Sequence, residues 1–304
     1  MELPLSEKDI AEAIGRELKS PIRAYPLTEV GIDQRAFVDT FSGFFEQLDW
    51  DPYDVRRLRV EFLKSKFPEA AEQIDRLFRS YYKGETDEHV FSAWIAQLGE
   101  AAQADYYAIQ PWRRRSVARF QVTSDSMTRQ EVPAFKQEVD VEDIRSWPRT
   151  FMEAPREHVE NDLFLSWLRS IFELVCSVRP DCKHLEITVH FMSVQATIKS
   201  PGDNSPEGAH EDGADFIVSA LVINRINVTG GQSQILEKVS EDHKEIIFAH
   251  TLQPGEFIFQ ADTGEEKIYG NDLWHHVTPF HIENPDLGPG WRDIIGLDII
   301  VNPE

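Results

Sequence analysis

The residues best suited to chemistry form a short motif in the C-terminal half of the chain, His210-Glu211-Asp212. On an extended backbone, side chains at positions i and i+2 leave from the same face, so His210 and Asp212 can converge on one point. An imidazole and a carboxylate that converge are two of the three ligands in a common metal-binding set. Taken alone, the motif is weak, because it arises by chance in many proteins of this length and a surface histidine beside acidic residues is the commoner explanation.

The residues after this motif indicate an antiparallel sheet. Residues 216–223 are apolar and partly β-branched, which is typical of a buried strand. Thr229-Gly230-Gly231 is a turn signal, and a second apolar stretch, Gln234-Ile235-Leu236, follows it. This pattern predicts a hairpin directly after His210 and Asp212, with the two side chains at the mouth of the sheet.

A third ligand is then expected from a later strand. Residues 273–279, LWHHVTP, form an apolar, strand-like run that contains two adjacent histidines, His275 and His276. Their side chains should face opposite ways on a strand, so only one of them can join the motif. Arg292 opens a closing strand over residues 292–301. Two histidines and one carboxylate would complete the facial triad of non-haem Fe(II) oxygenases.

The order of these residues resembles that of the iron(II)- and 2-oxoglutarate-dependent dioxygenases. The segments PEGAHEDGADFIVSALVINRINVTGG, LWHHVTPF and RDIIGLDII are similar to the bacterial family whose members hydroxylate free amino acids, such as isoleucine 4-hydroxylase. Weaker similarity extends upstream, so that the resemblance covers roughly residues 115–304. The first hundred or so residues have no counterpart in the shorter members.

The resemblance implies Fe(II), 2-oxoglutarate and O2 as cofactor and cosubstrates. It implies metal ligation by His210, Asp212 and His275, because the family pattern is His, any residue, Val. It also implies that Arg292 binds the distal carboxylate of 2-oxoglutarate, although an ion pair with Asp293 is the structural alternative. A retained aspartate at position 212 favours hydroxylation over halogenation.

One departure from the family pattern concerns the partner of Arg292. Many of these dioxygenases carry a serine two residues after the arginine, whereas this chain has Ile294. The partner of the arginine must therefore come from elsewhere in the chain.

Three further residues are candidates for contacts with the substrate. A free amino acid needs a cation for its carboxylate and an acceptor for its ammonium group. Arg225 follows the predicted hairpin strand and could supply the cation, or it could instead form a salt bridge that holds the turn. His190 and Gln195 lie on the strand expected over residues 185–198 and could touch cosubstrate or substrate, or serve as interior polar residues.

Composition limits the classes of partner. The 304 residues carry a formal net charge of −22, which argues against nucleic-acid or anionic-membrane partners because phosphates would be repelled. Two cysteines in a chain of this length do not suggest a disulfide scaffold. The N-terminus has no basic flank and no apolar core, so we expect no secretory signal and a cytoplasmic location.

The overall pattern predicts an α+β protein in two parts. Residues 1–110 have helical spacing of apolar positions, with Asp51-Pro52 as a helix start, and form a predicted helical N-terminal region. Residues 111–304 contain many short strands with turns and one amphipathic helix over 162–175. The resemblance makes this second part a double-stranded β-helix, a jelly-roll or cupin-like core with helices packed outside.

The expected activity is hydroxylation of an unactivated C–H bond of a small free amino acid or cyclic imino acid. Two alternatives stay open: a hydroxylase of an amino acid tethered to a carrier protein, and a non-catalytic jelly-roll module that binds metal. The sequence identifies neither the amino acid nor the carbon attacked, and it leaves the oligomeric state open.

Overall fold

The computed structural model describes residues 22–134, 147–240, 243–262 and 273–302. The chain divides into two compact units, one of Met1–Leu48, Arg115–Val132 and Met152–Glu304, and one of Asp49–Arg114 and Pro133–Phe151. The first unit holds the sheets and the second is mainly helical. The sequence predicted a division at residue 110, whereas in the structure residues 22–48 pack in the sheet unit.

The sheet unit contains a large antiparallel sheet in the order β1-β10-β6-β13-β5-β3, with β4 paired to β3. A second sheet has the order β11-β8-β9, and β12 pairs with β7. The bounds of these strands are β1 Arg23–Pro26, β3 Arg113–Thr123, β4 Met127–Gln130, β5 His184–Ala196, β6 Phe216–Ile226, β7 Val228–Gly230, β8 Ser233–Ser240, β9 His243–His250, β10 Glu256–Ala261, β11 Leu273–Val277, β12 Phe280–Ile282 and β13 Gly290–Asn302.

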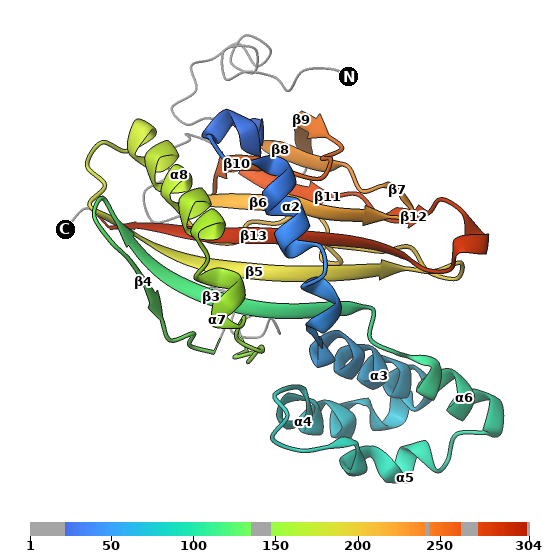
Figure 1. Ribbon diagram of the computed structural model, residues 1–304. Helices are drawn as coiled ribbons and strands as arrows, with labels where there is room; N and C mark the ends of the chain where they lie inside the picture. The colour runs from blue at the N-terminus through green and yellow to red at the C-terminus, as the bar shows by residue number, and fades with distance from the viewer. Residues whose placement is uncertain (1–21, 135–146, 241–242, 263–272, 303–304) are drawn as a thin grey trace. The chain divides into compact units, whose positions relative to one another are not determined.

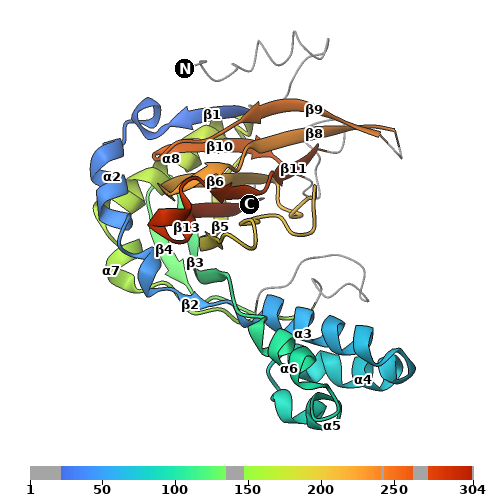
Figure 2. The same cartoon turned by 90° about the vertical axis from the view of Figure 1, so that its right-hand side faces the viewer.

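Helices cover one face of the large sheet, and the smaller sheet lies on the other side (Figures 1 and 2). The helices of this unit are α2 Gln34–Phe41, α7 Arg156–Val159 and α8 Asp162–Val178, with the short turns η1 Leu27–Val30, η2 Phe45–Gln47 and η6 Pro285–Leu287. The apolar stripe predicted over residues 162–175 is the buried face of α8. Two antiparallel sheets with helices outside confirm the predicted jelly-roll class.

The side-chain alternation of β5 separates the helix-covered face from the interior. The Phe191 ring contacts those of Phe41 and Phe164, at centroid distances of 6.2 and 6.0 Å, so Phe191 points toward α2 and α8. His190 and Met192 flank Phe191 and therefore point to the opposite face, between the two sheets. Any site built inside the jelly roll must use this second set of side chains.

The helical unit has its own apolar core, which includes Leu63, Ile74, Phe91 and Tyr106. As predicted, Asp51 caps a helix that begins at Pro52, and its carboxylate accepts a hydrogen bond from the Tyr53 amide. The elements of this unit are β2 Asp49–Trp50, α3 Pro52–Lys66, η3 Pro68–Ala70, α4 Ala71–Tyr82, η4 Glu88–Phe91, α5 Ser92–Ile95 and α6 Glu100–Ala108.

The predicted hairpin between β6 and β8 is wrong. These strands lie in different sheets, because β6 pairs with β10 and β13 while β8 pairs with β9 and β11. Positive φ angles at Asn227, Gly230 and Gly231 turn the connecting segment, and its strand β7 pairs with β12. The Thr-Gly-Gly signal therefore marks a crossover from one sheet to the other.

Two further predictions need correction. Arg23–Pro26 forms the edge strand β1 within the region expected to be helical, and its proline lies at the strand end, where a missing N–H is tolerated. The His210 motif also does not lie on a regular strand, since only an isolated bridge joins His210 to His275. The helix expected from Ser6 lies outside the described residues.

Candidate metal centre

Three side chains that are far apart in the sequence meet at one point in the sheet unit. One ligand atom from each of His210, Asp212 and His275 lies within 4.8 Å of the others. The backbones of the two histidines form a reciprocal pair, with N–O distances of 3.0 and 2.9 Å. This bridge holds the imidazole rings side by side, with centroids 4.2 Å apart.

A hydrogen bond to the backbone defines the orientation of the His210 ring. The Nδ1 atom of His210 lies 2.9 Å from the Gly208 carbonyl oxygen, to which it can donate, and this leaves Nε2 as the ligand atom. That Nε2 is 3.6 Å from Asp212 Oδ1, and His275 Nε2 is 3.3 Å from Asp212 Oδ2. Two imidazole nitrogens and a carboxylate on one side of a point are the donor set of the facial triad, which leaves coordination positions open for other ligands.

The adjacent histidine does not join this group. Residues 273–277 form the strand β11, so the His276 side chain points away from the face that carries His275. The grouping of His275 with His210 and Asp212 agrees with the register inferred from the His-x-Val pattern.

The electrostatics of the triad favour an ionised carboxylate. Burial by itself would raise the pKa of Asp212, but the neighbouring His275 and then His210 lower it below its ordinary range. Burial would lower the pKa of His275, whereas Asp212 and more weakly Asp262 and Glu207 raise it to about 9. Burial and the charge of His275 lower the pKa of His210. This half-buried, ionised carboxylate is available as an anionic ligand for a cation.

A second cluster, of two arginines, lies where β13 and β6 pair. Arg292 is fully buried, and its Nη1 donates to Asn204 Oδ1 at 2.9 Å. Arg225 is directly opposite on β6. Burial, together with the charge of Arg225, lowers the pKa of Arg292 to about 9. Among the described residues, Arg292 Nε and Nη2 and Arg225 Nη1 have no hydrogen-bond partner, so an anion would satisfy them.

Arg225 also holds the crossover segment. Its Nη2 donates to the Gly230 carbonyl oxygen at 2.6 Å, so the structural alternative considered for Arg225 is realised as a hydrogen bond to the backbone. A Cβ atom on Gly231 would lie 3.4 Å from Arg292 Cδ and 3.5 Å from Arg225 Nη1. The glycine at position 231 thus lets the backbone approach both arginines.

The two other predicted site residues lie on different faces of β5. His190 points to the interior and its Nε2 lies 2.9 Å from Asp298 Oδ2, while its charge contributes to the lowered pKa of Asp212. Gln195 pairs with Trp291 and shares the face of Phe191, which the helices cover. The structure therefore brings His190 toward the triad and does not bring Gln195 there.

Sequence reasoning missed three polar residues around the site. Asn204, the partner of Arg292, was not among the predicted site residues. Glu207 Oε1 lies 3.2 Å from His210 Nε2, and Asp262 bonds to the backbone beside Asp212. Glu207 could have been noticed from its place three residues before His210. No motif around Asp262 indicates a role in the site. It is one acidic residue after an apolar strand, 50 positions from Asp212 in the sequence.

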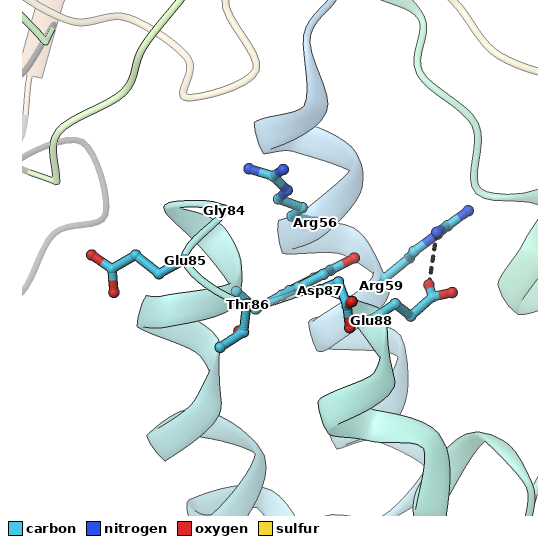
Figure 3. Close-up of a pocket in the computed structure, with 8 residues that line it drawn as sticks. Arg56, Arg59, Gly84, Glu85, Thr86, Asp87 and Glu88 are labelled. Atoms are coloured by element: carbon cyan, nitrogen blue, oxygen red, sulfur yellow. Dashed lines mark hydrogen bonds and ion pairs between the residues drawn. The ribbon is translucent and has the colours of Figure 1, made fainter.

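A pocket of about 540 Å³ also lies in the helical unit, lined by Arg56, Arg59, Tyr81 and the loop 84–88 (Figure 3). Its charges are largely paired, as Arg59 Nη1 lies 2.7 Å from Glu88 Oε1. The described residues that line it include no histidine or cysteine. The triad and the arginine pair therefore form the better candidate for catalysis.

Comparison with known proteins supports this choice. A family model described as 2OG-Fe dioxygenase matches residues 98–298. The chain is 27% identical over 164 residues to a 3(1)-hydroxy-L-isoleucine 4-dioxygenase from Pantoea ananatis (strain AJ13355), an alignment that covers 53% of this chain and 59% of that protein. The chain thus spans somewhat over half the length of this relative.

Two solved structures are also similar. A BsmA homologue from Methylobium petroleophilum PM1 is 16% identical with a TM-score of 0.58, and the match covers 98% of this chain and 87% of the other. A Bacillus thuringiensis protein described as IDO is 22% identical with a TM-score of 0.48, covering 71% and 89%. The first likeness supports the fold.

The described part of the chain contains no helix long and apolar enough to cross a membrane.

The segment matched by the family model is more than half of the 304 residues and contains the triad and both arginines. The chain therefore belongs to the 2OG-Fe dioxygenases, oxygenases that use Fe(II), 2-oxoglutarate and O2.

Proposed function

We propose that this protein hydroxylates an unactivated C–H bond of a small free amino acid or cyclic imino acid. The observation that carries the proposal is the grouping of His210, Asp212 and His275 inside a jelly roll that also holds the buried Arg292 beside the half-buried Arg225. Fe(II) with 2-oxoglutarate and O2 supplies the oxidising chemistry, in which 2-oxoglutarate becomes succinate and CO2. The similarity to a dioxygenase of hydroxy-isoleucine supports an amino acid as substrate.

In this proposal the three triad side chains hold the iron. The Gly208 carbonyl oxygen keeps His210 Nε2 turned toward the metal, and Asp212 supplies the negative charge. Arg292 binds the distal carboxylate of 2-oxoglutarate, because its fork of N–H donors matches the two carboxylate oxygens. Arg225 adds a second positive charge beside it, and Asn204 fixes the orientation of the Arg292 guanidinium.

Glu207 is our candidate for the acceptor of the substrate ammonium group. Its carboxylate lies beside the ligand nitrogen of His210 and is 30% exposed, and no Lys or Arg is paired with it among the described residues. An ammonium group would supply the missing charge partner. His190, held by Asp298, lies on the same interior face and is a candidate wall of the substrate pocket.

A succinate assay over a panel of amino acids tests the proposal. We expect succinate release that requires both Fe(II) and 2-oxoglutarate and that one free amino acid stimulates, with a product heavier by one oxygen atom. Activity only on an amino acid loaded on a carrier protein would shift the substrate class to tethered amino acids. Bound iron without succinate for every substrate would contradict an enzymatic function.

A further inference from the structure

The backbone of the ligand Asp212 is held by a second, buried carboxylate. Asp262 lies just after β10 and is only 4% exposed. One of its oxygens, Oδ2, accepts hydrogen bonds from three consecutive amides: Asp212 at 3.0 Å, Gly213 at 2.8 Å and Ala214 at 3.1 Å. Hydrogen bonds to an ionised acceptor are stronger than neutral ones, so this carboxylate organises the segment strongly.

Three successive amides can point at one oxygen only if the backbone curls. Gly213 supplies the curl with a φ of +86°, in the left-handed region. Before residues 212–214 the backbone is paired at His210, which forms a bridge with His275. After them it continues into the strand β6. The curl therefore begins at Asp212 itself and sets the direction in which its side chain leaves the backbone.

The segment is also tied at its far end. The amide of Asp262 donates to the Asp215 carbonyl oxygen at 3.1 Å, and the Asp215 amide donates to the Ile299 carbonyl oxygen at 3.0 Å. The curl is thus fixed between β10 and β13, the strands that flank β6 in the large sheet. The His210 side of the motif has no such anchor to β10 among the described contacts.

We propose that Asp262 is a positioning residue, whose carboxylate holds residues 212–214 in the curl that brings Asp212 to the two imidazoles. This inference rests on the proposed iron site and adds to it a residue that does not touch the metal. Partners of metal ligands act in this way, and their replacement typically costs about 10- to 100-fold in metal affinity.

The test measures Co(II) affinity and the visible absorption spectrum of the Co(II) protein, which reports the geometry of the ligands. For Asp262→Asn we expect affinity to fall by about 10- to 100-fold, with an altered spectrum and an unchanged far-UV circular dichroism spectrum. The matched control is Asp215→Asn, a neighbouring carboxylate whose Oδ2 accepts a bond from the Val301 amide at 2.7 Å. The control should bind Co(II) as the wild type does.

A second pair of variants examines the curl without touching Asp262. A Cβ atom on Gly213 would meet nothing within 4 Å, so Gly213→Ala opposes only the left-handed backbone. Gly288→Ala imposes the same kind of strain, at φ +82° and also with no contact within 4 Å, away from the triad. We expect Gly213→Ala to weaken Co(II) binding and Gly288→Ala to leave it unchanged, even if Asp262→Asn fails to fold.

The outcomes separate the two proposals. Wild-type Co(II) affinity and spectrum in both Asp262→Asn and Gly213→Ala would overturn the positioning role and leave the iron site standing. An equal loss in Asp215→Asn or Gly288→Ala would overturn it as well, because the effect would then be general destabilisation. A wild-type protein that binds neither Co(II) nor Fe(II) would overturn the iron site and, with it, the role of Asp262.

Discussion

The two histidines of the triad differ in the environment of their Nδ1 atoms. His210 Nδ1 is hydrogen-bonded to the Gly208 carbonyl oxygen, whereas His275 Nδ1 is buried without a partner among the described residues. His275 is held instead by its backbone bridge to His210 and by the strand β11. The position of His275 on that strand brings its imidazole to His210 and Asp212, whereas the His276 side chain leaves from the opposite face.

Replacing His275 and His276 one at a time should show which of the two histidines binds the metal. His275→Ala removes one of three ligand atoms, so Fe(II) or Co(II) affinity should fall by at least about 100-fold. His276→Ala, on the opposite face of β11, should keep wild-type affinity. Titration of the metal-free variants with Co(II) measures both. Loss of metal in His276→Ala alone would mean that the register is shifted by one residue.

Arg292 presents a buried charge that lacks a full set of partners in the protein. For Arg292→Met we expect KM for 2-oxoglutarate to rise by about 100-fold, the size of a lost charge-assisted pair of hydrogen bonds. The Tm of the protein without ligands should stay equal or rise, because a buried cation is removed. Arg225→Met should raise the same KM less. A lower Tm together with an unchanged KM would assign Arg292 a structural role.

Replacing Glu207 should weaken binding of the amino acid and leave binding of 2-oxoglutarate unchanged. Glu207→Gln keeps the shape of the side chain but removes its charge, so KM for the amino acid should rise by about tenfold or more. KM for 2-oxoglutarate and Co(II) affinity should stay near wild type. A large loss of Co(II) affinity in Glu207→Gln would make this carboxylate a fourth metal ligand and contradict its assignment to the ammonium group.

At the scale of elements, the strand β5 serves two purposes with its two faces. Phe191 anchors α2 and α8 on one face, and His190 faces the jelly-roll interior on the other. The period of two in a strand makes this division possible, and it also explains why Gln195, five residues after His190, lies on the wrong face for a substrate contact.

Substitutions on the two faces of β5 should have different effects, one on the stability of the protein and the other on its kinetics. Phe191→Ala empties a fully buried ring position and should lower the free energy of unfolding by about 3–5 kcal/mol. His190→Gln should change that free energy little but alter KM for the amino acid. Denaturant unfolding and succinate kinetics on both variants check this. Similar stability losses in both would contradict the division of the strand.

At the scale of the whole molecule, the ligands and both arginines lie in one unit. His210, Asp212, His275, Arg225 and Arg292 all fall within the sheet unit, while the helical unit has a separate core. The chain carries a net charge of −22, although its cosubstrate, 2-oxoglutarate, is itself an anion. The buried Arg292 and the half-buried Arg225 therefore provide a local positive site that the average composition does not suggest.

Metal and cosubstrate should consequently stabilise one unit selectively. Co(II) with 2-oxoglutarate at 100 times Kd should add about 2.7 kcal/mol to the stability of the unit that binds them. Hydrogen–deuterium exchange under argon should show increased protection in β5, β6, β11 and β13, and little change in α3 to α6. Removal of the metal by a chelator should reverse the effect. Equal protection in α3 to α6 would contradict a site confined to the sheet unit.

The sequence alone was enough to predict the fold class and to propose which residue types, in which order, form the metal site. His210, Asp212, His275 and Arg292 could be proposed as site residues because motif spacing and family likeness can be read from short segments of the chain. Helix starts such as Asp51-Pro52 were predictable for the same reason. These features depend on neighbouring residues, whose physical preferences act over a few positions.

The folded protein was needed to find the distant residues that contact the triad and Arg292. Asn204 meets Arg292 across 88 positions and Asp262 meets Asp212 across 50, and no local pattern encodes such contacts. The Thr-Gly-Gly segment was misread because a turn signal fixes a change of direction but not the sheet that the next strand joins. Strand pairing is determined by the packing of the whole core, so the partners of β6 and β8, and with them the shape of the site, follow from the complete fold.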